Sequence, residues 1–118
     1  MTDIFDPLTL PCGQTLPNRL CKAAMEENMA EDGQVPGEGL RRLYGAWAEG
    51  APGLILTGNV MVDARALTGP GGVVLEAHTL DDAKTMTRFT EWAAAGKAGG
   101  SKLWMQISHP GRQVYNSQ

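Results

Sequence analysis

The sequence predicts an α/β fold in which parallel strands alternate with helices. Two segments repeat apolar residues at helical spacing, and a short, largely apolar segment follows each of them. Glycine and proline lie between these segments, where turns are needed. The expected order is a hairpin, then strand, helix, strand, helix and strand. Pattern alone leaves open whether such a sheet is doubly wound or closed into a barrel.

The first part of the chain predicts a tight hairpin followed by a strand. Three prolines and a glycine are spaced closely within residues 7–17, as in a chain that turns sharply. The segment RLCKAAM at residues 19–25 is short and largely apolar. It predicts a buried strand, although its alanines lower the strand propensity. Cys21 is therefore expected to be a small core residue.

The next segment predicts an amphipathic helix and a second strand. The helix begins after Pro36 and ends at Gly50. Apolar residues at i, i+3, i+4 and i+7 form its expected buried face: Leu40, Leu43, Tyr44 and Trp47. The run GLILT at residues 53–57 does not alternate, which is typical of a strand covered on both faces.

A long loop over residues 63–78 precedes a second helix and a third strand. Thr79, with Asp82 three positions later, predicts an approximate capping box at the helix start. The expected helix face consists of Ala83, Met86, Phe89 and Ala93, and Trp92 is also expected in the core. Glycines within residues 96–100 end this helix, and KLWMQI at residues 102–107 predicts the third strand.

Composition limits the classes of function. The chain has 118 residues, of which 42% are apolar, and a formal net charge of −3 without long blocks of like charge, so no nucleic-acid or membrane partner is expected. Cys12 and Cys21 lack CxxC spacing and a nearby histidine, so neither a metal site nor a disulfide framework is expected. With no basic leader at the N-terminus and no apolar stretch near ~20 residues, we expect a soluble, cytoplasmic protein.

Three blocks give a more specific indication. NRLCKAAM at residues 18–25, GLILTGN at residues 53–59 and MQISHPGR at residues 105–112 are similar, in order and spacing, to consecutive blocks of the old yellow enzyme family. These are FMN-dependent NADH:flavin oxidoreductases of the ene-reductase type. The resemblance implies a (β/α)8 TIM barrel, which needs about 250 residues. Residues 1–118 are then a single incomplete domain, consisting of the hairpin and about three β/α units.

The resemblance also implies that FMN lies across the C-terminal ends of the strands. The expected cofactor-binding residues are Ala24, Met25, Glu26, Gly58, Asn59 and Gln106. Gln106 offers a donor and an acceptor to the pyrimidine edge of the flavin, and backbone N–H groups after the first strand can donate to its N5 and O4 edge. Many family members have proline at Ala24 and threonine or cysteine at Glu26, so the role of Glu26 stays open. Asn28 stands where one branch has an active-site tyrosine.

Each of these residues also has a structural interpretation. Gln106 can be a buried glutamine that satisfies backbone groups. His109 is expected to orient its neighbourhood by hydrogen bonding rather than to donate a proton. Arg112 can pair with a carboxylate or reach the flavin region. Trp104 is the aromatic residue expected to line a barrel or ligand wall.

The activity that the resemblance implies is hydride transfer from NAD(P)H through FMN to a small-molecule activated alkene of the enone type. The family's residues that bind the substrate carbonyl, donate the proton and hold the FMN phosphate have no counterpart before Gln118, so no catalytic residue is assigned. The chain alone is expected to be inactive and to need the remainder of the barrel or a partner chain. Two alternatives stay open: a non-catalytic half-barrel that forms a homo-oligomer through open strand edges, and another TIM-barrel enzyme class.

Overall fold

The structure is a computed structural model, and it describes residues 1–114. The helices and strands follow the expected order, with one additional short strand and two 3₁₀ helices. The elements are β1 (Leu8–Thr9), β2 (Thr15–Leu16), β3 (Cys21–Lys22), α1 (Glu38–Glu49), β4 (Leu54–Met61), β5 (Val73–Val74), η1 (Ala77–Asp81), α2 (Ala83–Lys97), β6 (Lys102–Ser108) and η2 (Gly111–Gln113). Within the described range, every helix is too short or too polar to cross a bilayer.

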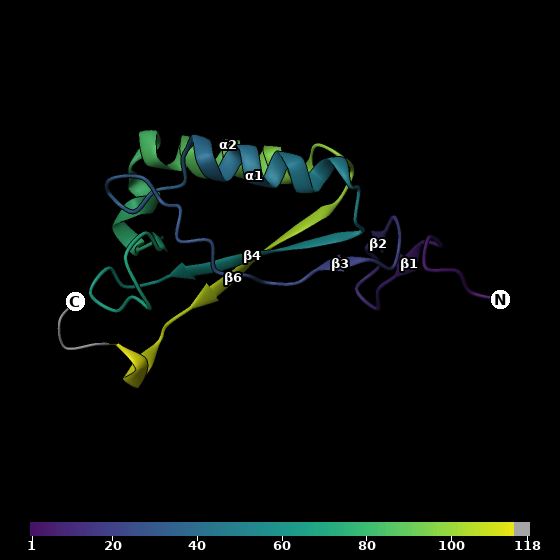
Figure 1. Cartoon of the computed structure of the whole chain (residues 1–118), viewed down its shortest axis with the longest axis horizontal. Helices are drawn as coiled ribbons and strands as arrows, with labels where there is room; N and C mark the ends of the chain where they lie inside the picture. Colours follow the sequence, from purple (N-terminus) through teal and green to yellow (C-terminus); the bar gives the residue numbers. More distant parts are fainter. Residues whose placement is uncertain (115–118) are drawn as a thin grey trace.

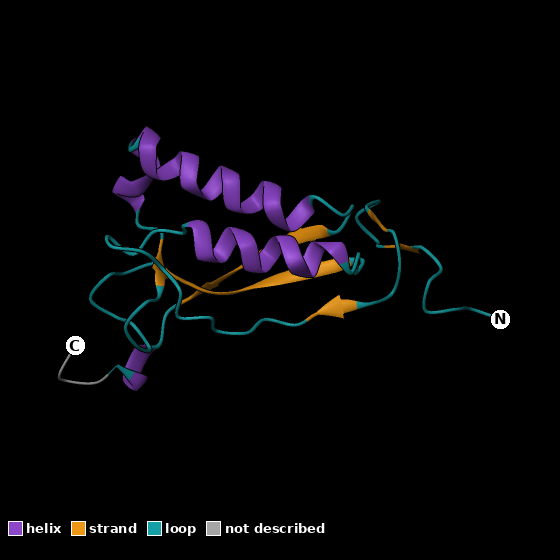
Figure 2. Cartoon of the chain, turned by 45° about the horizontal axis from the view of Figure 1, so that its top comes forward, coloured by secondary structure: helices purple, strands orange, loops and turns teal. Residues whose placement is uncertain are grey.

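The main sheet is parallel, as predicted, and β4 is its central strand. β6 pairs with β4 along most of its length, whereas β3 and β5 each pair with two residues of β4. The separate hairpin of β1 and β2 is antiparallel. Both long helices lie side by side on one face of the sheet (Figures 1 and 2). β5 was not predicted, because two valines after a glycine-rich loop are too few to give a pattern.

The hydrophobic core lies between these helices and the sheet. It is formed by Leu40, Tyr44, Ile55, Val60, Val73, Phe89 and Trp92. The rings of Tyr44 and Trp92 meet edge to face with centroids 5.2 Å apart, a favourable geometry for aromatic pairs. The predicted apolar faces are thereby confirmed for Leu40, Tyr44 and Phe89, with Trp47 and Met86 packed at the margin of this core. Ala83, which was also expected on the buried face, is exposed at the start of α2.

A β-bulge interrupts the pairing of β4 with β6. Leu56 is paired with Trp104 and Asn59 with Gln106, so two residues of β4 stand opposite the single residue Met105. Ile55 and Val60 both belong to the core, although they are five positions apart and strict alternation would place them on opposite faces. The bulge therefore reverses the facing of every later residue in β4.

The prediction of a buried first strand over residues 19–25 was wrong in two respects. Only two residues of it pair, and Cys21 is exposed. Lys22 occupies the position that faces the helices, where its Nζ lies 4.2 Å from the centroid of the Trp47 ring. Since successive strand residues face opposite ways, Cys21 points to the other face of the sheet.

The start of α2 also differs from the prediction. Thr79 forms a capping box with Glu76, which begins the short helix η1. Asp82 caps α2 instead, since its carboxylate accepts a hydrogen bond of 3.1 Å from the backbone N–H of Lys84. Two caps follow each other because two helices begin within a few residues.

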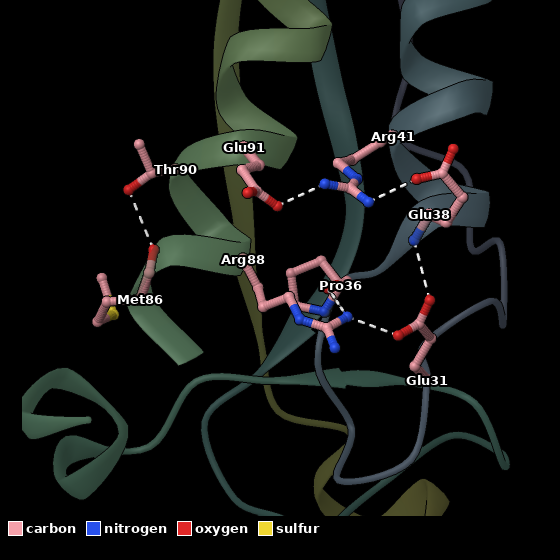
Figure 3. A network of polar contacts seen from close by, with 8 residues as sticks. All are labelled: Glu31, Pro36, Glu38, Arg41, Met86, Arg88, Thr90 and Glu91. Atoms are coloured by element: carbon pink, nitrogen blue, oxygen red, sulfur yellow. Dashed lines mark hydrogen bonds and ion pairs between the residues drawn. The ribbon is translucent and has the colours of Figure 1, made fainter. Parts of the chain in front are cut away.

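Ion pairs connect the two helices with the loop that precedes α1 (Figure 3). Arg88 of α2 pairs with Glu31 of the loop at 2.5 Å, and Glu31 also accepts from the backbone N–H of Glu38 at 2.9 Å. Arg41 pairs with Glu38 and with Glu91, each at 2.5 Å. The loop, α1 and α2 are thus joined by one polar network on the outside of the helix layer.

Candidate functional site

Asn59 and Gln106 lie side by side on β4 and β6. They are register partners in the sheet, and adjacent strands are about 4.8 Å apart. Because Val60 and its register partner Ile107 share the helix-facing side, Asn59 and Gln106 face away from the helices. Gln106 is exposed in this chain, and Asn59 is half-buried. The two carboxamides place donors and acceptors together on an open surface.

The positions of the candidate residues relative to the strand ends differ from the prediction. β4 continues to Met61, so Gly58 and Asn59 lie within the strand and not at its end. β6 continues to Ser108 beyond Gln106. β3 ends at Lys22, so residues 24–26 lie in the segment that follows it. The prediction placed the strand ends elsewhere because apolar runs reveal neither the bulge in β4 nor the short pairing of β3.

Gly58 brings the segment after β3 close to β4. A Cβ atom on Gly58 would lie 2.2 Å from the carbonyl oxygen of Met25 and 2.3 Å from a carboxylate oxygen of Glu27. Gly71 approaches the same segment further on, where a Cβ atom would lie 2.6 Å from the carbonyl oxygen of Asn28. Glycine is therefore needed at both positions, and the candidate segment at residues 24–28 is held against the sheet by two close backbone contacts.

A buried polar cluster lies behind this segment on the helix side. The Tyr44 hydroxyl donates to the Glu27 carboxylate and accepts from the backbone N–H of Gly58 at 3.1 Å. Burial raises the pKa of Tyr44 far above its ordinary value, and the bond to Glu27 raises that pKa further. Burial lowers the pKa of Lys22, which the nearby Glu27 partly offsets. Tyr44 therefore stays protonated and acts as a hydrogen-bond donor.

Of the candidates after β3, Met25 and Glu26 are exposed and Ala24 is half-buried. Met25 is 56% exposed, and Trp104 on β6 is 50% exposed. Glu26 is also exposed, and its carboxylate accepts a hydrogen bond from the Thr68 hydroxyl. Glu26 thus contacts the loop between β4 and β5.

His109 and Arg112 follow β6. The Nδ1 atom of His109 accepts a hydrogen bond of 3.0 Å from the backbone N–H of Gly111, and its expected orienting role stays a prediction. Arg112 is exposed and lines a hollow of about 380 Å³ together with Thr68 and Val114.

The sequence did not single out Thr57 or the hydroxyl of Tyr44. Thr57 accepts a hydrogen bond of 3.0 Å from the backbone N–H of Gln106 and donates one of 2.8 Å to the carbonyl of Gly58. Two signals were available: a threonine inside an apolar run, and a tyrosine on a helix face that needs a partner for its hydroxyl when buried. Neither signal predicts which groups these two hydroxyls bind.

Known proteins share both the sequence and the fold of this chain. It is 46% identical over 107 residues to an NADH-dependent flavin oxidoreductase of Neonectria sp. (strain DH2), in an alignment that covers 91% of this chain and 14% of that protein. It superposes on morphinone reductase in complex with tetrahydroNAD with a TM-score of 0.80 and 23% identity, covering 98% of this chain and 29% of the other. The old yellow enzyme of Pichia sp. AKU4542 gives a TM-score of 0.79 at 18% identity, with coverages of 96% and 28%.

No family description matches the chain. The chain spans less than a third of each protein compared above, with shares of 14%, 29% and 28%. The two solved structures therefore share with it the fold of one part of a TIM barrel. The flavin oxidoreductase shares its sequence over the same part.

Proposed function

Because this chain belongs to the old yellow enzyme family of flavin oxidoreductases, as its N-terminal portion, we propose that it supplies part of an FMN site. The chemistry that FMN supplies when bound is hydride transfer, from NAD(P)H to an activated alkene of the enone type. Residues 1–118 then form one incomplete domain of the barrel. Substrate turnover requires the remainder of the barrel or a partner chain.

The pairing of Asn59 with Gln106 carries this proposal. The pyrimidine edge of a flavin presents both donors and acceptors, and a carboxamide side chain matches both kinds of group. Gln106 is exposed. Trp104 on the same strand is 50% exposed, and Met25 in the segment after β3 is 56% exposed. The exposed amide of Gln106, with the half-buried amide of Asn59 beside it and Trp104 two positions away on β6, fits a flat ring with a polar edge.

The proposed roles differ between the candidate residues. Gln106 and Asn59 would hold the pyrimidine edge, and backbone N–H groups at residues 24–26 would donate to the N5 and O4 edge. The N–H of Gly58 already donates to Tyr44, so Gly58 would contribute through its lack of a side chain. Its close approach fixes the position of the segment that contacts the ring.

A second candidate is a half-barrel that associates with itself through its open edge. Ile107 and Met105 on β6 are 68% and 38% exposed, and an open strand edge with apolar side chains is a template for pairing. The third alternative, another class of TIM-barrel enzyme, is disfavoured by the 46% identity to a flavin oxidoreductase. The first two candidates predict different results with FMN.

The proposal is tested by titrating FMN into the chain and into the variants Gln106→Leu and Gln14→Leu, with flavin fluorescence as the readout. Gln14 is an exposed glutamine in the hairpin and serves as the control. We expect binding by the wild type and by Gln14→Leu, and about tenfold weaker binding by Gln106→Leu, as for the loss of one or two hydrogen bonds. Equal affinities for all three would contradict the assignment of Gln106. A colourless chain whose sedimentation shows concentration-dependent association would favour the half-barrel.

A further inference from the structure

We propose that Thr57 is a positioning residue, whose hydroxyl holds the bulge of β4 in the form that places Asn59 beside Gln106. The proposal concerns the arrangement of the two strands. Only its consequence for cofactor binding rests on the proposed FMN site.

The bulge determines which way Asn59 faces. Thr57 lies on the helix-facing side, where it lines a small cavity with Phe89 and Trp92. In an unbroken strand Asn59 would face the same side, because residues two apart share a face. The additional residue reverses this, and Asn59 pairs with Gln106 on the open face instead.

A bulge interrupts the ladder, so its backbone groups need other partners. The N–H of Gln106 donates to the Thr57 hydroxyl at 3.0 Å, and that hydroxyl donates to the carbonyl of Gly58 at 2.8 Å. The side chain of Thr57 thus replaces a backbone bond between β4 and β6. Thr57 is 2% exposed, so water is not available to take over these bonds.

The other backbone group of the bulge is bound from the opposite direction. The N–H of Gly58 donates to the Tyr44 hydroxyl at 3.1 Å and to the Glu27 carboxylate at 3.3 Å. Tyr44 therefore fixes Gly58 from α1, but it makes no bond to β6. The bond that links the backbone of Gln106 to the bulge comes from Thr57.

Two substitutions separate the hydroxyl from the volume of the side chain. Thr57→Val keeps the shape and removes both hydrogen bonds, whereas Thr57→Ser keeps the hydroxyl and removes a methyl group. A matched control is Thr90→Val. The Thr90 hydroxyl donates to the carbonyl of Met86 at 3.0 Å on the exposed side of α2, away from the bulge (Figure 3).

The first measurement is amide hydrogen exchange by NMR in the 118-residue chain, which needs no flavin. Exchange at Gln106 is expressed relative to Lys102 on the same strand, whose N–H donates to the carbonyl of Gly53 at 3.0 Å. This ratio removes any change in global stability. We expect the ratio to rise about tenfold in Thr57→Val, the effect of one lost hydrogen bond, and to stay near the wild-type value in Thr57→Ser and Thr90→Val.

The second measurement is FMN affinity of the same variants. We expect Thr57→Val to bind about tenfold more weakly than the wild type and Thr57→Ser to restore the affinity. If the wild type does not bind FMN but the exchange ratio rises in Thr57→Val alone, the FMN site is wrong and the positioning role of Thr57 stands.

An unchanged exchange ratio in Thr57→Val would overturn the proposal, and so would an equal rise in Thr57→Ser. If Thr57→Val does not fold, the comparison is made between Thr57→Ser and Thr57→Ala. Both lack the methyl group and differ in the hydroxyl. Equal ratios in that pair would likewise overturn it.

Discussion

The guanidinium of Arg88 on α2 donates a hydrogen bond of 2.5 Å to the carboxylate of Glu31, 57 positions earlier in the chain (Figure 3). This contact ties α2 to the loop that follows the candidate segment at residues 24–28. The bond from Arg88 lowers the pKa of Glu31, and a second bond from the backbone N–H of Glu38 lowers that pKa further. The ionised carboxylate is thus the form that the folded chain stabilises.

The pair between Arg88 and Glu31 predicts a stability that depends on pH. The pKa of Glu31 is lower in the folded chain than its ordinary value of 4.5. The stability that the pair contributes is therefore present at pH values above this ordinary pKa. It is lost as the pH falls through the lower pKa of the folded chain. We expect Arg88→Met to lower the urea midpoint of unfolding slightly at neutral pH and to leave it unchanged at strongly acidic pH.

Arg42→Met is the control for this experiment, because Arg42 is exposed on α1 and has no ion-pair partner among the described residues. Its urea midpoint should follow the wild type at both pH values. A deficit of Arg88→Met that has the same size at neutral and acidic pH would show that the ion pair is not its cause.

Gly58→Ala is expected to destabilise the chain. The added Cβ atom would overlap the backbone oxygen of Met25 at 2.2 Å, and overpacking of this kind costs about 1–3 kcal/mol. Gly45→Ala is the matched control, because a Cβ atom on Gly45, inside α1, meets nothing within 4 Å. It should raise the free energy of unfolding by about 0.5–1 kcal/mol. Urea unfolding measures both, and a loss of similar size in the two variants would contradict the contact at Gly58.

Tyr44→Phe removes a hydroxyl that binds two partners in the buried cluster. Glu27 and the N–H of Gly58 each lose a hydrogen bond, so we expect the free energy of unfolding to fall by about 1–3 kcal/mol. Thr87→Val, which removes an exposed hydroxyl bonded to the carbonyl of Ala83 within α2, should change it little. A calorimetric or urea measurement that finds Tyr44→Phe as stable as the control would exclude a stabilising role for this cluster.

Tyr44 also predicts the response to alkaline pH. Its pKa is higher in the folded chain than the ordinary value of 10.0. The stabilising contribution is therefore complete below that ordinary value and declines as the pH rises above it. The stability difference between wild type and Tyr44→Phe should shrink at alkaline pH. In difference absorbance, the Tyr44 phenolate signal should appear only when the chain unfolds, and an earlier appearance would contradict its burial.

The sequence predicts the helices and the longer strands because each of them buries a regular apolar pattern. The faces around Tyr44 and Phe89 and the runs within β4 and β6 needed only spacing to be recognised. β3 is different, because its position depends on Lys22 packing over the Trp47 ring. That contact lies between residues far apart in sequence, so local pattern places Cys21 on the wrong side.

Short motifs in the sequence identify the residues of the candidate site, but they do not predict how these residues are arranged. Asn59 and Gln106 were identified as separate residues, but their pairing depends on the bulge at Thr57 and Gly58. An additional residue in a strand leaves no periodic signal, and one of the backbone groups at this bulge, the N–H of Gly58, is bound by a tyrosine on a helix. Tertiary contacts of this kind become visible only when the elements are assembled.

The bulge also means that the length of β4 matters separately from its composition. A substitution at Thr57 or Gly58 alters one side chain, whereas the deletion of either residue would turn every following side chain of the strand around. Asn59 would then enter the layer packed against the helices, and Val60 would be presented to the open face. Insertions and deletions between Gly53 and Met61 should therefore be tolerated far less than substitutions at the same positions.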